Sequence, residues 1–397
     1  MQRNGLPRCI PLPRQGNALN RRAWVMNGFE NVKKNFGFGC MRLPMKDGKV
    51  DYAVFSEMVD LFMAGGFNYF DTARVYLGGQ SETAIRDCLV KRYPRESFVL
   101  ADKLSSPLFS REEDIVPLFE KQLASCGVGY FDFYLMHAQT RASFEKYRDC
   151  RAYETAFGLK RQGRIRHVGI SFHDTAEVLD MILTAYPAIE FVQIQFNYVD
   201  YDDPTVQSKD VYDVCRRHGK PVIVMEPVKG GSLANLPDDA RAVFDRLSGG
   251  SAASYAVRYA AGFDGVMTVL SGMSNTEQMK DNLSYMTDFR PLDGNEMKAV
   301  DEVRSIVLSK KLIPCTSCRY CTDGCPKHIP VPEFFSCLNS KRVYRDRTAD
   351  GVYGKLCTDH GVRASDCADC GRCERSCPQH LPIRELLREA AAEFDGK

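Results

Sequence analysis

Eight short apolar runs alternate with amphipathic stretches between residue 36 and residue 290 of this 397-residue chain. Several of the runs are apolar nearly throughout, which is typical of parallel strands that are buried on both faces. Eight strands that alternate with helices over about 250 residues predict a (β/α)8 barrel. The expected strands are 37–41, 67–71, 97–102, 131–136, 166–171, 191–196, 221–226 and 265–270.

The stretches between the runs have apolar residues at helical spacing. DYAVFSEMVDLFMAGG (51–66) ends in two glycines, and SETAIRDCLVKRY (81–93) opens with Ser81, which is expected to cap its helix. The alternative fold is an open doubly wound sheet, which usually carries G-x-G-x-x-G after its first strand. Because GFGCMRLP (37–44) lacks the third glycine, the barrel is favoured.

The composition narrows the class of protein. Lys+Arg number 53 against 51 Asp+Glu, so no basic surplus points to nucleic acid. No apolar run approaches the roughly 18 residues of a membrane span. The first 30 residues are basic and lack the apolar centre of a secretory signal, so we expect residues 1–30 to be a disordered or non-native leader. We expect the barrel over 31–292 and a small helical domain over 293–397, where no strand pattern continues.

Polar residues follow three successive strands of the expected barrel. Asp71 closes the run FNYFD and Tyr76 follows it, while Lys103 and His137 stand after the next two runs. In a (β/α)8 barrel, active sites lie at the carboxyl ends of the strands and in the loops that follow. Each residue alone could be a turn, surface or core residue, but four of them at one end of the barrel predict a catalytic site.

These four groups suit proton transfer at an oxygen atom. A phenol with a pKa of about 10 is a poor donor or acceptor at neutral pH. A neighbouring ammonium favours the phenolate and lowers that pKa, and a carboxylate fixes the ammonium in place. The sequence therefore predicts chemistry on a small-molecule carbonyl or alcohol, in which a proton moves at oxygen while hydride moves at carbon.

Six segments resemble, in their order, the aldo-keto reductase family: FDTARVYLGGQSE, ADKL, LMH, GRIRHVGIS, VQIQFN and LSGMSNTEQMKDN. The resemblance covers residue 36 to about residue 290 and implies a nicotinamide cofactor over the barrel mouth. It further implies Tyr76 as general acid, Lys103 and Asp71 as its tuners, and His137 as the residue that orients the substrate. The expected cofactor-binding residues are Ser171, Gln193, Gly230, Gly231, Ser232, Gln278, Asp281 and Asn282.

The chain departs from the family pattern at two cofactor positions. Phe172 replaces the Asn that usually follows the serine at position 171, and Gln278 stands where NADP-preferring members carry an Arg. Without that cation a 2′-phosphate lacks its bidentate partner, so NAD(P) is expected but a preference for NADP is not. Flavin is an alternative carrier. The substrate pocket is expected from loops such as 104–112, 138–150 and 198–208.

Sixteen cysteines in a chain that is not short and loop-rich indicate a reduced, cytoplasmic interior and not a disulfide scaffold. Eight of them form two runs, CTSCRYCTDGCP and CADCGRCERSCP, with the spacing C-x2-C-x2-C-x3-C-P. This spacing is that of bacterial ferredoxins, in which the fourth Cys of each run usually ligates the other [4Fe–4S] cluster. Structural zinc is the alternative. The expected ligand sets are Cys315, Cys318, Cys321 and Cys377 for one cluster, and Cys367, Cys370, Cys373 and Cys325 for the other.

Hydride chemistry and clusters differ in how they carry electrons, because a nicotinamide passes two at once and a cluster passes one. Three hypotheses follow. The clusters exchange electrons with the barrel, with a flavoprotein or ferredoxin as partner; or they are structural or sense oxidants beside an ordinary NAD(P)H-dependent carbonyl reductase; or the protein is a non-catalytic redox-responsive regulatory subunit. The four polar residues after the strands argue against the third, and two clusters in series favour the first.

Overall fold

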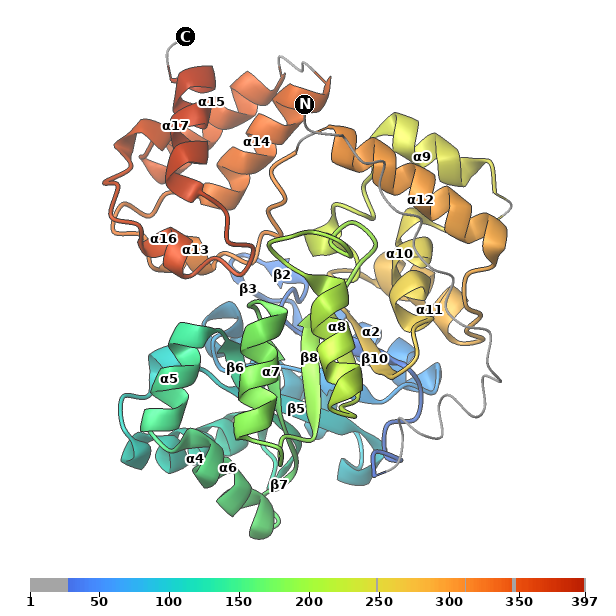
Figure 1. Cartoon of the computed structure of the whole chain (residues 1–397), viewed down its shortest axis with the longest axis vertical. Coiled ribbons are helices and arrows are strands. Elements are labelled where there is room, and N and C mark those ends of the chain that lie inside the picture. Colours follow the sequence, from blue (N-terminus) through green and yellow to red (C-terminus); the bar gives the residue numbers. More distant parts are fainter. Residues whose placement is uncertain (1–27, 248, 311, 345–347, 396–397) are drawn as a thin grey trace. The chain divides into compact units, whose positions relative to one another are not determined.

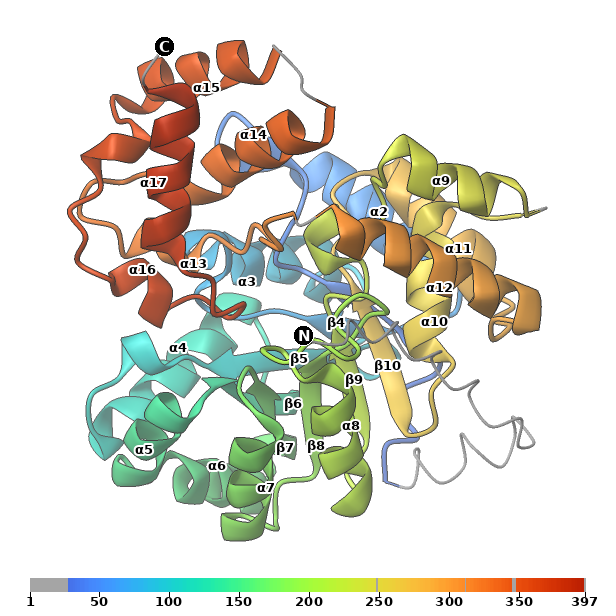
Figure 2. The same ribbon diagram turned by 45° about the horizontal axis from the view of Figure 1, so that its top comes forward.

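The computed structural model describes residues 28–247, 249–310, 312–344 and 348–395. Eight parallel strands close into a barrel in the order β1, β10, β9, β8, β7, β6, β5, β4 (Figures 1 and 2). The predicted (β/α)8 barrel is therefore confirmed, and each of the eight expected runs forms a strand. The strands are β1 (Phe36–Gly39), β4 (Tyr69–Asp71), β5 (Val99–Leu104), β6 (Phe131–Gln139), β7 (Ile165–Phe172), β8 (Phe191–Gln195), β9 (Val222–Met225) and β10 (Val266–Ser271).

Helices follow the strands, and a small hairpin, β2 (Met45–Lys46) and β3 (Lys49–Val50), follows β1. Helix α2 shows why these stretches are helical: Asp51 accepts hydrogen bonds from the first free N–H groups, and Phe55, Met58, Val59 and Phe62 form one buried face. The helices of this part of the chain are α2 (Tyr52–Ala64), α3 (Gln80–Ile85), α4 (Ile115–Cys126), α5 (Arg141–Asp149), α6 (Ala152–Arg161), α7 (Ala176–Ala185), α8 (Ser208–Arg217), α9 (Asp238–Asp245), α10 (Ala252–Ala261), α11 (Thr276–Met286) and α12 (Gly294–Ser309).

Two local predictions are wrong. Ser81 does not cap its helix but lies inside α3, where its hydroxyl contacts Thr72 Oγ1 at 2.7 Å and donates to the Cys40 carbonyl at 2.8 Å. Segment 138–150 is not a loop, because Thr140 caps helix α5 within it. In the first case a tertiary hydrogen bond takes the serine that a helix end could have used; in the second, the capping threonine sits in a stretch that has few apolar residues.

The barrel interior is filled by aromatic and aliphatic side chains. Phe29 is buried in this core, with its ring 5.7 Å from that of Phe133 and 4.4 Å from that of His167. The packed barrel therefore includes Phe29, which precedes the boundary expected at residue 31. Residues 1–27 of the expected leader lie outside the described residues.

The described chain divides into two compact units, and the division does not follow the sequence order. One unit holds the barrel strands and consists of the described residues up to Pro227 together with Ala253–Met297; the other combines Val228–Ala252 with the described residues from Lys298 onward. The predicted domain boundaries at 292 and 293 stay predictions.

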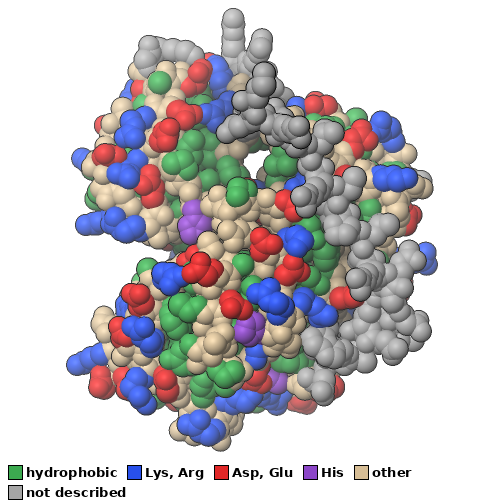
Figure 3. Space-filling model, in the orientation of Figure 1, with side chains coloured by type: hydrophobic (Ala, Val, Ile, Leu, Met, Phe, Trp, Pro, Cys, Tyr) green, Lys and Arg blue, Asp and Glu red, His purple; other side chains and the backbone are tan. Residues whose placement is uncertain are grey.

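The C-terminal part of the second unit is helical, as predicted. Its core is aromatic: the ring of Tyr353 lies 4.6 Å from that of Phe334 and 4.5 Å from that of Phe394. Lys and Arg side chains are interspersed with Asp and Glu over these helices on the face in Figure 3. Within the described ranges, no helix is long and apolar enough to span a bilayer. The helices are α13 (Tyr320–Asp323), α14 (Val331–Tyr344), α15 (Thr348–His360), α16 (Arg372–Arg375) and α17 (Ile383–Phe394).

Candidate functional site

Three adjacent strands carry the polar residues that were predicted to be catalytic. Asp71 ends β4, Lys103 lies in β5, His137 lies in β6, and Tyr76 begins a 3-10 turn (Tyr76–Gly79) shortly after β4. All four side chains are buried, and the most exposed of them, Tyr76, is 7% accessible. The structure thus brings the four residues together at the carboxyl ends of neighbouring strands.

Lys103 forms a buried ion pair. Its Nζ donates to Asp71 Oδ1 at 2.5 Å and to the Thr72 carbonyl at 2.7 Å. The same Nζ lies 4.9 Å from the ring centroid of Tyr76. A buried ion pair is stable only when its geometry is good and further hydrogen bonds support it. The bond to Thr72 supports the ammonium, while Asp71 Oδ2 is buried with no hydrogen-bond partner among the described residues. The ammonium is thereby fixed over the phenol.

His137 also lies beside Tyr76. The two ring centroids are 5.8 Å apart at 79°. His137 Nδ1 is 2.6 Å from Ser105 Oγ, and the Tyr147 hydroxyl donates to the His137 carbonyl at 3.1 Å. These contacts fix both the ring and the backbone of the imidazole.

Burial governs the protonation of the site. It raises the pKa of Tyr76 well above its ordinary value, with added effects of the Asp71 and Asp102 carboxylates. This net direction is opposite to the lowering that we expected from Lys103, because removing a phenolate from water is more unfavourable than the nearby charges can offset. Burial, helped by Lys103 and His173, lowers the pKa of His137 well below its ordinary range. The resting site holds a protonated phenol beside a neutral imidazole.

Two of the expected nicotinamide contacts are neighbours. Ser171 and Gln193 are register partners on β7 and β8. The Ala138 N–H donates to Ser171 Oγ at 2.8 Å, and Gln193 Nε2 donates to Met225 Sδ at 3.7 Å. Gln193 Oε1 is buried and has no hydrogen-bond partner within the described part of the chain. Such an acceptor suits the N–H groups of a carboxamide.

The remaining expected contacts fall in two places. At the start of α11, Gln278 Oε1 accepts from the Ser274 N–H at 2.8 Å, and Asn282 Nδ2 donates to the Gln278 carbonyl at 2.9 Å. Asp281 is half-buried on the same helix. Gly230, Gly231 and Ser232 belong to the other compact unit, so the described geometry does not place them with Ser171 or Gln193.

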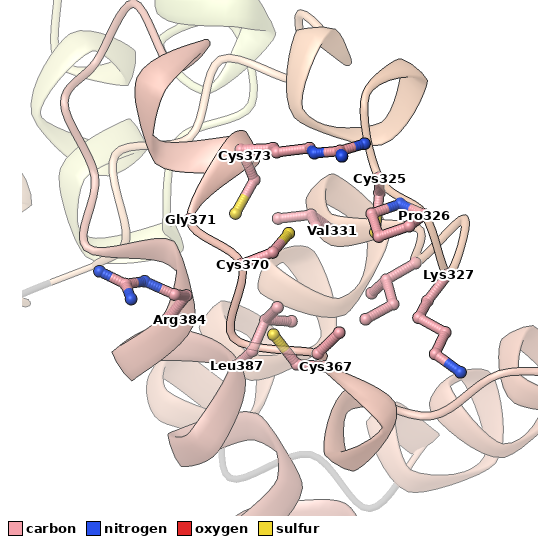
Figure 4. A pocket seen from close by; sticks show the side chains of 13 residues that line it. Cys325, Pro326, Lys327, Val331, Cys367, Cys370, Gly371, Cys373, Arg384 and Leu387 are labelled. Carbon is pink, nitrogen blue, oxygen red and sulfur yellow. The ribbon is translucent and has the colours of Figure 1, made fainter.

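One group of four cysteines lines a common pocket, which we call the outer pocket. Three of these cysteines come from the second run and the fourth, Cys325, comes from the first. All four line the same pocket (Figure 4). Cys370 is exposed and Cys373 is buried. The cysteines that line the outer pocket are Cys325, Cys367, Cys370 and Cys373.

The other four cysteines line a second pocket, which we call the inner pocket. Here three come from the first run and Cys377 comes from the second. Buried Thr316 and Gln379 line the same cavity. Burial and the neighbouring Cys318, Cys315 and Cys377 raise the pKa of Cys321 to about 12. The cysteines that line the inner pocket are Cys315, Cys318, Cys321 and Cys377.

The donor set fits clusters better than single ions. Zinc holds its thiolates at about 2.3 Å, so its ligands crowd together. In the described ranges, no three His, Cys, Asp or Glu side chains are arranged to hold one metal ion. Four thiols around each of two cavities instead match the four thiolates that a [4Fe–4S] cluster takes.

Sequence reasoning missed several residues that support the site. Ser105, the partner of His137, stands one residue beyond strand β5, where polar residues after apolar runs were the available signal. His173 Nδ1 lies 3.1 Å from Gln195 Oε1, and Gln195 Nε2 donates to Glu226 Oε2 at 3.2 Å. These three stand at the ends of successive strands and form a second polar chain beside the first.

The fold, the buried polar cluster and the paired thiol pockets define an oxidoreductase with an iron–sulfur domain. The sequence matches the profile of the aldo/keto reductase family over residues 35–305 and that of a 4Fe-4S dicluster domain over residues 314–382. The chain therefore belongs to the aldo/keto reductase family and carries a C-terminal 4Fe-4S dicluster domain.

Curated relatives are oxidoreductases. The uncharacterized oxidoreductase YqkF of Bacillus subtilis is 24% identical over 295 residues, which cover 66% of this chain and 90% of the relative. The NAD(P)H-dependent D-xylose reductase xyl1 of Hypocrea jecorina is 33% identical over 112 residues, which cover 27% of this chain and 33% of the relative.

Solved structures share the barrel fold. The holo form of aldo-keto reductase AKR11C1 from Bacillus halodurans superposes with a TM-score of 0.57 at 24% identity, covering 68% of this chain and 92% of that one. An aldo-keto reductase from Klebsiella pneumoniae in complex with NADPH superposes with a TM-score of 0.55 at 20% identity, covering 69% and 95%. At these identities the likeness establishes the fold alone.

Proposed function

We propose that the barrel interconverts a small carbonyl compound and its alcohol, with Tyr76 as the general acid and base. The observation that carries this proposal is the buried cluster of four side chains: Lys103 is bonded to Asp71, and the ring of Tyr76 lies close to both Lys103 and His137. Burying a charged pair beside a phenol and an imidazole lowers the stability of the fold. Such clusters of buried titratable groups are typical of functional sites.

In the direction of reduction, the protonated phenol of Tyr76 gives its proton to the substrate oxygen. The phenolate that remains is stabilised by the Lys103 ammonium, which Asp71 holds in place. The 2.6 Å contact between Ser105 Oγ and His137 Nδ1 allows the hydroxyl to donate to Nδ1. In that arrangement the neutral imidazole carries its proton on Nε2, from which it would donate to the substrate oxygen and orient it. A bound nicotinamide supplies the hydride, and Ser171 and Gln193 would hold its carboxamide.

NADH or NADPH is the proposed donor, in line with the relatives and neighbours named for these cofactors. Gln278 argues against a preference for the 2′-phosphate, because an amide cannot form the bidentate, charge-assisted contact of an arginine. Flavin, bound here or on a partner, enters only as the carrier that splits an electron pair into single electrons.

We further propose that the inner and outer pockets each hold one [4Fe–4S] cluster, with the fourth ligand of each supplied by the other run. When bound, such clusters supply single-electron transfer. A flavoprotein or a ferredoxin is then the proposed partner that exchanges electrons with them. The alternative is an NAD(P)H-dependent carbonyl reductase whose clusters are structural or sense oxidants.

Tyr76→Phe tests the catalytic proposal. It should lower carbonyl turnover by about 10² to 10⁴-fold, the usual contribution of a positioned proton donor, while iron content stays unchanged. Tyr69→Phe is the matched control, because Tyr69 is a buried tyrosine of β4 whose hydroxyl has no partner within the described residues. Unchanged turnover in Tyr76→Phe would contradict the assignment.

Mixing the anaerobic protein with NADH or NADPH, with and without added flavin, separates the two cluster hypotheses. Electron exchange predicts that the visible absorbance of the clusters bleaches. If the clusters stay oxidised while a carbonyl is reduced, the structural or sensing role stands. If no carbonyl or alcohol turns over under any condition, the protein is the regulatory subunit of the third hypothesis.

A further inference from the structure

The loop that follows strand β9 packs closely against the inner pocket. Gly230 has φ +66°, and a Cβ at this position would lie 2.3 Å from the carbonyl oxygen of Thr316. Thr316 is buried and stands between Cys315 and Cys318 in the sequence. Both segments belong to the same compact unit. Only glycine allows this approach, so the loop is built to touch the inner pocket.

The same loop brings a lysine to Gln379, a residue that lines that pocket. Lys229 has φ +46° and is 4% exposed. Its Nζ donates to Gln379 Oε1 at 3.4 Å, and buried Gln379 stands two residues after Cys377 and lines the inner pocket. A left-handed backbone at a non-glycine residue is strained by about 1–3 kcal/mol, and such strain is typical of functional sites. Lys229 thus places a buried positive charge against a residue that lines the inner pocket.

The outer pocket has cations too, but they are more exposed than Lys229. Lys327 and Arg372 line it and are exposed, and half-buried Arg384 is paired with Glu374, Nη2 to Oε2 at 2.8 Å. Exposed charges are screened by solvent and salt, whereas a buried charge acts through a lower effective dielectric constant. Lys229 is therefore the cation from which a cluster should feel the larger effect.

We propose that Lys229 tunes the reduction potential of the cluster held in the inner pocket. A cluster with four thiolate ligands is anionic, and reduction adds one further negative charge. The ammonium of Lys229 stabilises that added charge and so raises the potential of this cluster. The inference rests on the proposed function only in requiring that the two pockets hold clusters.

A redox titration of the anaerobically purified holoprotein tests the proposal. The potential is set in the presence of redox mediators, and EPR reports the reduction of each cluster. Lys229→Gln should make reduction of one cluster about tenfold less favourable, a downward shift of about 59 mV for a one-electron step, and leave the other in place. Lys229→Arg keeps the positive charge, so the potential of that cluster should stay close to that of the parent protein. Lys327→Gln is the matched control on the outer pocket, and we expect it to move neither potential by more than a small fraction of that amount.

Several outcomes would overturn the proposal. These are an unchanged potential in Lys229→Gln, an equal shift of both clusters, or a shift in Lys229→Arg as large as in Lys229→Gln, which would indicate packing and not charge. Should Lys229→Gln fail to accumulate, Gln379→Glu places a carboxylate against the ammonium and should shift the same potential downward; no shift there counts against the proposal equally. Iron well below two clusters in the parent protein would instead contradict the proposed function.

Discussion

The inner and outer pockets have the same backbone in different surroundings. Each is built on a short helix, α13 or α16, that carries the third cysteine of its run. A histidine follows each run, and its backbone N–H donates to the carbonyl of the fourth cysteine at 3.1 Å; the two are His328 and His380. Three positions in each run have matching left-handed φ angles: Ser317 and Asp369 at 55° and 52°, Arg319 and Gly371 at 67° and 68°, and His328 and His380 at 54° and 50°.

The two pockets differ in the residues that surround their thiols. The inner pocket is lined by buried Thr316 and Gln379, against which the loop of Lys229 and Gly230 packs. The outer pocket has exposed Cys370 at its edge. The repeated spacing therefore sets how the thiols are presented, while the residues between the cysteines and a distant loop make the two sites different. Four predictions test this comparison.

The largest effect should come from removing two ligands at once. Cys315→Ser with Cys377→Ser removes ligands of the inner pocket only, so about half of the iron should remain. Cys315→Ser with Cys325→Ser touches both pockets and should lose nearly all of it. Iron analysis and visible absorbance report the result. The reverse pattern would mean that each run holds its own cluster.

Exposure to oxidant should distinguish the pockets next. Because Cys370 is exposed, the cluster of the outer pocket should decay first under air or ferricyanide, and the inner one several-fold more slowly. EPR during timed oxidation follows the two populations. A single common decay rate would show that the difference in burial has no chemical consequence.

Gly230→Ala should disturb only the inner pocket. The new Cβ would meet the Thr316 carbonyl, and such overpacking destabilises by about 1–3 kcal/mol, with the left-handed backbone adding to it. Urea unfolding measures the loss, and the EPR signal of one cluster should change. Gly354→Ala in α15 is the control, because nothing lies within 4 Å of its Cβ position and alanine favours the helix.

The smallest effect belongs to the surface of the outer pocket. Arg384→Gln removes a partly exposed ion pair with Glu374 and should reduce stability by only about 0.2–1 kcal/mol, less at high salt. Urea unfolding at two ionic strengths checks this. A loss as large as that of Gly230→Ala would show that the outer pocket is equally dependent on its surroundings.

The barrel could be predicted because its signals are local. Apolar runs marked all eight strands, and the ends of those runs pointed to Asp71, Lys103 and His137. The cap predicted at Ser81 is wrong because the hydroxyl of this serine forms tertiary contacts with Thr72 and Cys40 and does not cap the helix. The net effect of burial on the Tyr76 pKa depends on packing that no short segment encodes.

The approach of Gly230 to Thr316 lies further beyond sequence reasoning. The two residues are far apart in the chain, and no periodicity or spacing links them. KGGSL has the composition of a phosphate-binding turn, which is why a cofactor contact was expected there. That role remains a prediction, but the contact that the structure describes for Gly230 is with the neighbour of Cys315.

The exchange of the fourth cysteine between runs has a consequence for how this region matures. If ligands are shared as proposed, inserting either cluster links a residue of the first run to one of the second and closes the intervening chain, α14 and α15 included, into a loop. The first insertion bears the entropy of that closure, and the second joins ends that are already held together. Iron loading should then be cooperative, with protein carrying one cluster scarce during assembly.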